Sequence, residues 1–380
     1  MPPDQQTDAA APRRPRLTPP IADVRRAVRA VLAPGAEAPR RVEGTDARHA
    51  DADSGESPDI PATQRGLVLV ALSGGADSLA LAAATAFEAP RSGWRAGAVV
   101  VDHGLQPGSA EVAATAAATA RELGLDPVLV RRVEVPSTGS GSTGGPEASA
   151  REARYAALDE TAAETGAALV LLGHTLDDQA ETVLLGLARG SGAASLSGMP
   201  ARTGRYARPL LGIRRAETRQ ACVDAGLTPW DDPHNLDPAY SRVRVRERVL
   251  PVLEAELGPG IAEALARTAE QLREDEAAFS EQIEEFIEEI CEPAEAGIAI
   301  SIGALAANPA ALRQRIIRHV VGSEFGVSLS RAQTLEVARL ATDWHGQGPI
   351  DLPGGVLATR AGRHVVLSTT GSTEILPHDH

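Results

Sequence analysis

Four largely apolar runs, each followed by a helix-like stretch, constrain the fold of this chain more than any other feature. The runs cover residues 66–72, 96–103, 126–135 and 167–174. A strand that is buried on both faces has a continuous apolar sequence, as in a parallel sheet covered by helices on its two sides. The helix-like stretches cover residues 78–87, 109–123, 147–165 and 176–189. This alternation predicts an α/β fold with a doubly wound, mostly parallel sheet.

The remainder of the 380-residue chain is organised around this α/β block. We expect the block to form a domain at 65–235 and a smaller, mainly helical domain to follow at 236–372. The helical domain would contain a long helix at 261–291, two helices near 309–322 and 329–343, and a closing β-hairpin. Residues 1–64 are predicted to hold a tail, one short amphipathic helix at 21–32 and a partly disordered linker rich in small and polar residues. Residues 373–380 would form a second tail.

The charged residues limit the chemistry, because all 37 basic residues are arginine and the chain contains no lysine. No lysine can therefore reach a phosphate or form a Schiff base. Nucleotide chemistry would have to use backbone amides, hydroxyls, arginine and a metal ion. The net charge of −14 argues against indiscriminate binding to nucleic acid, but residues 202–219 hold six arginines and one acid. Such a basic face can still bind a polyanion selectively.

The cysteines and the apolar content indicate a cellular compartment. Cys222 and Cys291 stand far apart, so they suggest neither a disulfide framework nor a cysteine metal site. No apolar run approaches the roughly 20 residues that a bilayer crossing requires, and the N-terminus has no apolar signal segment. We therefore expect a cytoplasmic protein without a membrane partner.

The segment S-G-G-A-D-S at 73–78 interrupts the chain between the first apolar run and its helix. In doubly wound folds, ligands bind at the carboxyl ends of the strands. Glycines let backbone N–H groups approach an anion, and the N-terminus of the next helix adds donors. Asp77 would repel a phosphate unless a cation lay between them, which suggests Mg²⁺. We interpret the segment as a phosphate cradle; the simpler alternative is a strand–helix turn capped by a serine.

Three acids follow the fourth apolar run. Asp177, Asp178 and Glu181 are spaced so that they can share one face of the first helical turn. Acids are common at helix N-termini in any case, but three carboxylates at this edge would also suit an ammonium group or Mg²⁺. One of them could accept a proton from an amine. His174 is an alternative base, or simply a hydrogen-bonded histidine at the end of a strand.

The segment 73–78 lacks the Gly-Lys-[Ser/Thr] of a Walker A loop and resembles the PP-loop of the ATP pyrophosphatase superfamily, whose fold is adenine nucleotide α-hydrolase-like. Five further stretches narrow the resemblance to one family. They are VDHGLQPGS at 101–109, EASAREARYAAL at 147–158, LGHTLDDQAETVLLGLARGSGAASLSGM at 172–199, ARPLLGIRRAET at 207–218 and DPHNLDPAYSRVRVRERVLPVL at 232–253. In this order they resemble the tRNA(Ile)-lysidine synthetases, closely over residues 66–253.

The resemblance implies a ligase reaction. ATP would adenylate the wobble cytidine of a tRNA(Ile) with a CAU anticodon, and free L-lysine would then displace AMP. The product, lysidine, changes the codon and the amino-acid identity of the tRNA from Met to Ile. The implied ligands are ATP as substrate, Mg²⁺, lysine and tRNA. The oligomeric state is not fixed by the resemblance, and a homodimer is one option.

The resemblance also suggests a role for each candidate residue. ATP binding falls to Ser73, Gly74, Gly75, Ala76, Asp77, Ser78, Val101 and His103, with Asp77 as the metal ligand. Catalysis falls to Asp77, Arg151, Asp177 and Asp178, and lysine binding to Asp177, Asp178 and Glu181. Contacts to tRNA fall to Arg189, Arg202, Arg205, Arg208, Arg242, Arg244 and Arg246. Arg151 and Arg154 lie three apart on a helix, and we favour Arg151 as the cation beside the transferring phosphate; a solvated arginine pair is the alternative.

Other functions on the same fold stay open at this stage. A PP-loop tRNA thiolase would need a cysteine pair or an iron–sulfur cluster. A small-molecule adenylating amide ligase would need a source of ammonia, and a nucleotide-binding sensor would not need the acids together with the arginines.

Overall fold

The computed structural model describes residues 17–33, 65–104, 108–133, 145–190, 192–294 and 297–369. The chain divides into two compact units, Met1–Leu272 and Arg273–His380. Most of the tail and linker predicted within 1–64, and the tail at 373–380, lie outside the described residues. Within the described ranges, no helix combines the length and the apolar content that crossing a membrane would take.

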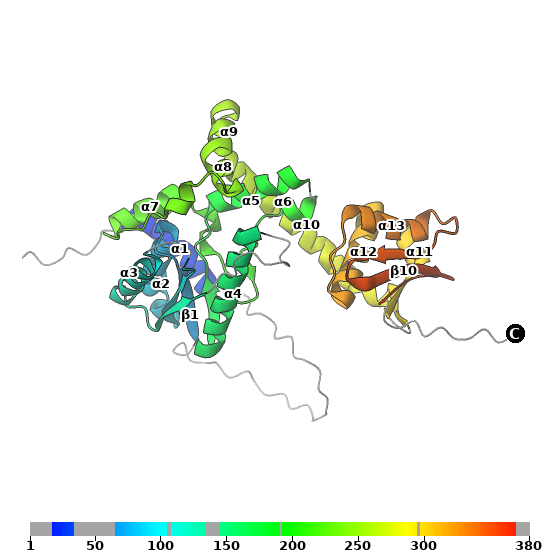
Figure 1. The fold of residues 1–380 in the computed structure, drawn as a ribbon, viewed down its shortest axis with the longest axis horizontal. Helices are drawn as coiled ribbons and strands as arrows, with labels where there is room; N and C mark the ends of the chain where they lie inside the picture. The colour runs from blue at the N-terminus through cyan, green and yellow to red at the C-terminus, as the bar shows by residue number, and fades with distance from the viewer. Residues whose placement is uncertain are drawn as a thin grey trace, which may run out of the picture. The chain divides into compact units, whose positions relative to one another are not determined.

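The first unit is built on a six-stranded sheet with the order β3-β2-β1-β4-β6-β5. Figure 1 labels β1 of this sheet and the surrounding helices. The predicted strands form β1 (Leu67–Leu72), β2 (Arg95–Asp102), β3 (Val128–Arg132) and β4 (Ala167–Leu171), and they pair in parallel. Two short strands extend the sheet, β5 (Arg202–Thr203) and β6 (Tyr206–Ala207), of which only β5 runs antiparallel to its neighbour. The predicted doubly wound, mostly parallel sheet is therefore confirmed.

Alternate residues of β1 enter two different apolar cores, as strand geometry requires. Val68 and Val70 pack into the core beneath four helices on one face of the sheet, and Leu67 and Leu69 pack into a second core beneath α4 (Gly145–Thr165). The four helices are α1 (Pro19–Leu32), α2 (Ala76–Glu88), α3 (Ser109–Glu122) and α7 (Arg215–Asp224). A short turn, η1 (Pro90–Ser92), joins α2 to β2.

The segments that surround the edge of the sheet are helical. They are α5 (Leu176–Arg189), α6 (Ala193–Leu196), η2 (Pro209–Gly212), η3 (Pro233–Leu236), α8 (Ser241–Arg244), η4 (Val245–Val249), α9 (Leu250–Leu257) and the first part of α10 (Ile261–Ile290). Leu176 and Ala180 of α5 share a buried cluster with Val245, Leu250 and Ala262. This packing explains why the first unit continues to Leu272, beyond the boundary we expected at 235–236.

The second unit packs helices against a five-stranded antiparallel sheet with the order β7-β8-β11-β10-β9. Its elements after α10 are β7 (Cys291–Ala294), β8 (Gly297–Ser301), α11 (Ile302–Ala307), α12 (Ala310–Phe325), α13 (Arg331–Thr342), β9 (Ile350–Leu352), η5 (Pro353–Gly355), β10 (Val356–Ala361) and β11 (His364–Thr369). The predicted closing hairpin is β10–β11. The strands β7, β8 and β9 were not predicted, and Cys291 begins a strand instead of ending a helix.

Candidate active site

The loop between β1 and α2 is shaped to receive an anion. Gly74 has φ +84°, which favours glycine, and the Trp230 N–H donates to its carbonyl oxygen at 2.9 Å. The hydroxyls of Ser73 and Ser78 lie 3.1 Å apart. Gly75, the N-cap of α2, offers no side chain to the first-turn amides of that helix. Those amides therefore remain available to a phosphate at the positive end of the helix.

The end of β4 comes unusually close to the same turn. A Cβ atom at Gly173 would lie 3.1 Å from the backbone nitrogen of Ser78 and 3.2 Å from the carbonyl carbon of Asp77. Glycine at 173 lets the two strand ends approach, so α5, which starts three residues later, begins beside the loop. Residues a hundred positions apart in the sequence thus share one edge of the sheet.

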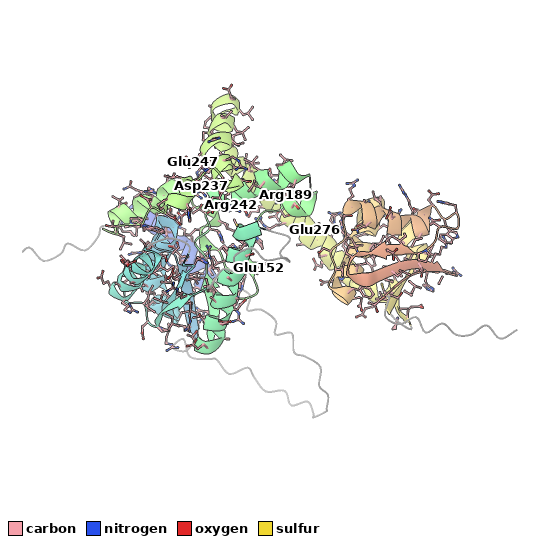
Figure 2. The ribbon with its side chains drawn as sticks, viewed as in Figure 1. Glu152, Arg189, Asp237, Arg242, Glu247 and Glu276 are labelled. Carbon is pink, nitrogen blue, oxygen red and sulfur yellow. The ribbon has the colours of Figure 1, made fainter. Side chains whose placement is uncertain are left out.

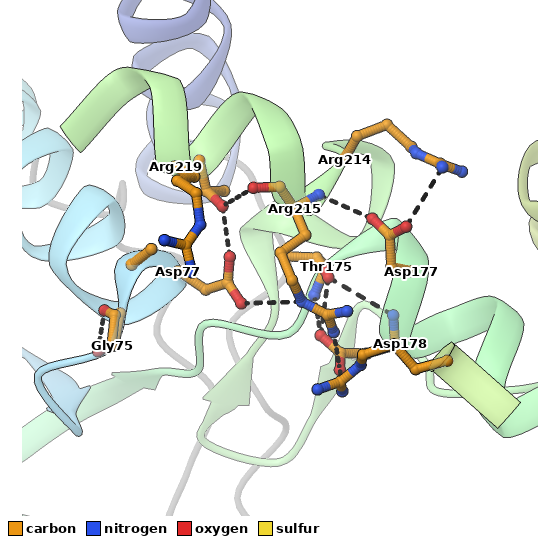
Figure 3. A network of polar contacts seen from close by, with 12 residues as sticks. Gly75, Asp77, Thr175, Asp177, Asp178, Arg214, Arg215 and Arg219 are labelled. Carbon is orange, nitrogen blue, oxygen red and sulfur yellow. Dashed lines mark hydrogen bonds and ion pairs between the residues drawn. The ribbon is translucent and has the colours of Figure 1, made fainter. Parts of the chain in front are cut away.

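Asp77 connects this loop to α7, as Figure 3 shows. Its Oδ1 accepts a hydrogen bond from the Thr218 hydroxyl, and its Oδ2 lies 3.6 Å from Nε of Arg215. Burial raises the pKa of Asp77, and the nearby Asp178 carboxylate adds to that effect, although Thr218 and Arg215 oppose it. A further cation near Asp77 would therefore stabilise its ionised form.

The three predicted acids do come together at the start of α5, but arginines already contact them. Asp178 and Thr175 form a capping box, with both Thr175 donors 2.8 Å from Asp178 Oδ2. Asp177 accepts a bond from the Arg215 backbone N–H at 2.7 Å. Glu181, whose side chain is 0% exposed, lies 3.3 Å from Nη1 of Arg215. One guanidinium, that of Arg215, thus reaches both the loop acid and the α5 acids (Figure 3).

Arg242 and Arg246 add two more cations to this network. Arg246 donates two hydrogen bonds to the Glu181 carboxylate, from Nε at 2.7 Å and from Nη2 at 3.1 Å. Arg242 lies 3.8 Å from Glu181 and 3.9 Å from Asp178. Burial alone would raise the pKa of Asp178, but Arg215 and the Thr175 N–H outweigh it and lower that pKa. Four acids, Asp77 among them, therefore meet arginines in one connected network.

The other arginines predicted for tRNA differ widely in environment. Arg208 is buried and donates to the Pro200 carbonyl at 2.9 Å. Arg244 donates to the Pro238 carbonyl at 2.6 Å. Arg205 lies 3.8 Å from Asp159, and Arg202 donates to Gly204 at 3.3 Å. Arg189, in the last turn of α5, is exposed (Figure 2).

The end of β2 holds the residues predicted to border adenosine. Val101 pairs with Arg131 in the sheet. Nε of Arg154 donates to Nε2 of His103 at 3.2 Å, and burial together with Arg154 lowers the pKa of His103. Arg151 is exposed and its guanidinium lies 5.1 Å from the Tyr155 ring. Arg154, rather than Arg151, is therefore the arginine that contacts the strand end in this structure.

His174 is poorly suited to act as a base at neutral pH. Burial lowers its pKa to about 4. Within the described ranges, its buried Nδ1 atom has no hydrogen-bond partner. The imidazole is therefore neutral under physiological conditions and accepts a proton weakly.

Sequence reasoning missed Arg215 and Thr218, which contact Asp77 most directly. Both belong to the run R-R-A-E-T at 214–218, which we used for the family resemblance and as part of a basic segment, without assigning either residue a role. Their spacing of three places them on one helical face, which is the signal that could have identified them. In the described ranges, no group of three or more His, Cys, Asp or Glu residues forms a ready metal site.

Two family profiles and several curated relatives are similar to this chain. Residues 54–253 match a family profile described as a PP-loop domain, and residues 300–365 match one described as a TilS substrate binding domain. The tRNA(Ile)-lysidine synthase of Leifsonia xyli is 65% identical over 306 residues, covering 80% of this chain and 91% of the relative. The one from Salinispora tropica is 50% identical over 355 residues, covering 91% and 96%.

A solved structure shares the fold alone. The U34-tRNA thiolase NcsA from Methanococcus maripaludis, with its 4Fe–4S cluster, aligns with a TM-score of 0.50 at 19% identity. The alignment covers 67% of this chain and 80% of that one.

Proposed function

We propose separate binding sites for ATP, lysine and tRNA, because this chain belongs to the tRNA(Ile)-lysidine synthases. The chain is an ATP-using ligase that forms a carbon–nitrogen bond in making lysidine on tRNA(Ile). One observation carries the finer proposal: Arg215 joins the loop acid Asp77 to the acids of α5 in a single network. ATP and lysine would therefore bind on two sides of one guanidinium.

The triphosphate would bind along residues 73–78. The uncapped amides of α2 and the hydroxyls of Ser73 and Ser78 would hold the β- and γ-phosphates. Val101 and His103 would border the adenosine. This arrangement needs no lysine side chain, which agrees with the composition of the chain.

Mg²⁺ fits the donors around Asp77. The ion prefers oxygen ligands and is commonly held by one or two carboxylates together with substrate phosphates. Asp77 supplies one carboxylate beside the phosphate cradle, and a nearby cation would offset the burial that raises its pKa. When bound, Mg²⁺ would neutralise charge between Asp77 and the leaving pyrophosphate.

The reaction would proceed in two steps. The O2 atom of the wobble cytidine attacks the α-phosphorus of ATP, and pyrophosphate leaves. The ε-amine of lysine then attacks C2 of the base, and AMP leaves. Arg151, which is exposed on α4, would stabilise charge on the transferring phosphate.

Lysine would bind at Asp177, Asp178 and Glu181. Asp177 is more exposed than the other two acids, so it would be the first to meet an incoming ammonium group. A carboxylate of this cluster, rather than His174 with its pKa of about 4, would take the proton from the attacking amine.

The tRNA would lie across the exposed arginines of the first unit. Arg189 and Arg248 are exposed and can contact phosphate or stack on a splayed base. Arg202, Arg205, Arg208, Arg242, Arg244 and Arg246 complete the proposed set, although their present contacts are within the protein. A tRNA substrate also supports our expectation of a cytoplasmic location.

Pyrophosphate release from ATP tests the proposal against its alternatives. We expect release to continue beyond one equivalent per enzyme only when both lysine and a tRNA(Ile) transcript with a CAU anticodon are present, because lysine must consume the adenylated tRNA formed in the first step. A transcript with the wobble cytidine replaced by uridine is the matched control. Continued release with tRNA but without lysine would indicate a thiolase-type reaction, release without tRNA a small-molecule ligase, and no release under any condition a sensor.

The cysteines already argue against thiolation. Burial raises the pKa of Cys222 to about 12 and that of Cys291 to about 11. Neither thiol would be ionised at neutral pH. The two belong to different units, and two cysteines are too few for the usual four ligands of an iron–sulfur cluster.

A further inference from the structure

Three residues on one face of α7 contact the residues at the start of α2. Arg215, Thr218 and Cys222 lie at intervals of three and four, so they project from the same side of the helix. Arg215 and Thr218 contact the carboxylate of Asp77, and Cys222 Sγ lies 3.3 Å from the Ala76 carbonyl oxygen. α7 therefore contacts the loop at residues 73–78 through Asp77 and Ala76, although none of these three residues belongs to the loop.

The Thr218 hydroxyl has one proton and two acceptors within reach. Its Oγ1 lies 2.8 Å from the Arg215 carbonyl oxygen and within hydrogen-bond distance of Asp77 Oδ1. Donation to a carboxylate is charge-assisted and stronger than donation to a neutral carbonyl. Thr218 is fully buried, so water does not compete for this proton.

The contact fixes the orientation of the carboxylate. Oδ1 is occupied by Thr218, whereas the nearest cation to Oδ2, Nε of Arg215, is 3.6 Å away and too distant for a hydrogen bond. Oδ2 thus keeps its acceptor capacity. We propose that Thr218 is a positioning residue that turns Oδ2 of Asp77 toward the magnesium ion of bound Mg·ATP. This inference rests on the proposed role of Asp77.

A purely structural role for Thr218 makes a different prediction. Buried threonines in helices often donate back to a carbonyl one turn earlier, as Thr85 does to Leu81 at 2.8 Å. Thr85 is fully buried in α2, and no acid contacts its hydroxyl in the described ranges. It is therefore a matched control for removing a buried hydroxyl without touching Asp77.

The experiment measures binding of a non-hydrolysable ATP analogue by calorimetry at a series of Mg²⁺ concentrations. The variants are Thr218→Val, Thr218→Ala, Thr218→Ser and Thr85→Val, with Asp77→Asn as reference. We expect Thr218→Val and Thr218→Ala to raise the Mg²⁺ concentration for half-maximal binding by about tenfold, as loss of a hydrogen bond to a charged group predicts. Thr218→Ser should restore it, and Thr85→Val should leave it unchanged. In turnover, the loss should fall on the KM for Mg·ATP and spare the KM for lysine.

The outcomes separate the two proposals. Wild-type Mg²⁺ dependence in a folded Thr218→Val or Thr218→Ala variant would overturn the positioning role while leaving Asp77 in place. An equal loss in Thr85→Val, or no rescue by serine, would also overturn it. If Asp77→Asn binds the Mg²⁺–analogue complex as tightly as the wild type, the proposed function of Asp77 fails instead.

Discussion

Replacing Glu181 with glutamine tests whether one buried carboxylate holds the arginines around α5. The Glu181 side chain is 0% exposed and accepts hydrogen bonds from Arg246 at 2.7 and 3.1 Å and from Arg215 at 3.3 Å. Glutamine keeps the size of the side chain but loses the charge. Its NH₂ group must also face a guanidinium, so Arg215, Arg242 and Arg246 lose one counter-ion at once.

The expected cost follows from the burial of the pair. Removing one partner of a buried ion pair costs about 3–5 kcal/mol because the other charge stays buried. Arg246 and Arg215 are 20% and 25% exposed, so water can recover part of the loss. We therefore expect about 3 kcal/mol, or a decrease in melting temperature of about 6–12 °C at roughly 2–4 °C per kcal/mol for a unit of this size.

Urea unfolding followed by tryptophan fluorescence measures the expected loss of about 3 kcal/mol in the free energy of unfolding. Trp94 and Trp230 report on the first unit, and a Trp344→Phe background removes the signal of the second. The control is Asp231→Asn, which breaks an Arg219–Asp231 pair of 2.7 Å whose side chains are 57% and 73% exposed. Exposed pairs contribute little, so the control should match the wild type. If Glu181→Gln unfolds at the same urea concentration as this control, our account of the network is wrong.

Four further predictions follow from single residues. Asp77→Asn should reduce pyrophosphate release at least about a hundredfold, for loss of electrostatic stabilisation, while gel-shift binding of tRNA is retained. The pKa of His174 is lowered to about 4 by burial, so the unfolded chain, with a pKa of about 6.5, binds the proton first. The stability from this neutral imidazole is complete above about pH 6.5 and declines toward pH 4; urea unfolding should show that His174→Gln removes this part of the slope. Arg208→Ala should lower stability by about 1–3 kcal/mol because it leaves the Pro200 carbonyl without its donor. Arg189→Ala should leave stability unchanged but reduce the salt slope of tRNA binding by roughly 0.7–0.9.

The sequence was sufficient to predict the sheet because burial on both faces leaves an unmistakable pattern. Residues 67–72 and 95–102 are apolar at nearly every position, since alternate side chains enter different cores. The loop at 73–78 could be interpreted for a similar reason, because its glycines and acid interrupt that pattern at a strand end. The short strands β5 and β6 have two residues each, too few to show any periodicity.

The partners of the arginines could not be predicted in the same way. The run R-V-R-V-R at 242–246 indicates a basic surface when taken alone. In the structure, Val243 and Val245 are buried, and Arg242 and Arg246, four positions apart, both point to Glu181. An arginine on a helix face looks the same in sequence whether it meets RNA or a carboxylate 65 residues away, because the choice is made by tertiary packing.

The geometry of guanidinium explains how a chain without lysine can build this site. Arg215 reaches Asp77 through Nε, Asp178 through Nη2 and Glu181 through Nη1. An ammonium group concentrates its charge at one point and could not span three carboxylates from two helices, whereas a planar fork can. In the proposed function, little reorganisation would remain when a cationic substrate binds beside these acids, because the fork already contacts all three. The same cation also contacts Asp77, so Arg215 links the α5 acids directly to the residue that we propose as the metal ligand.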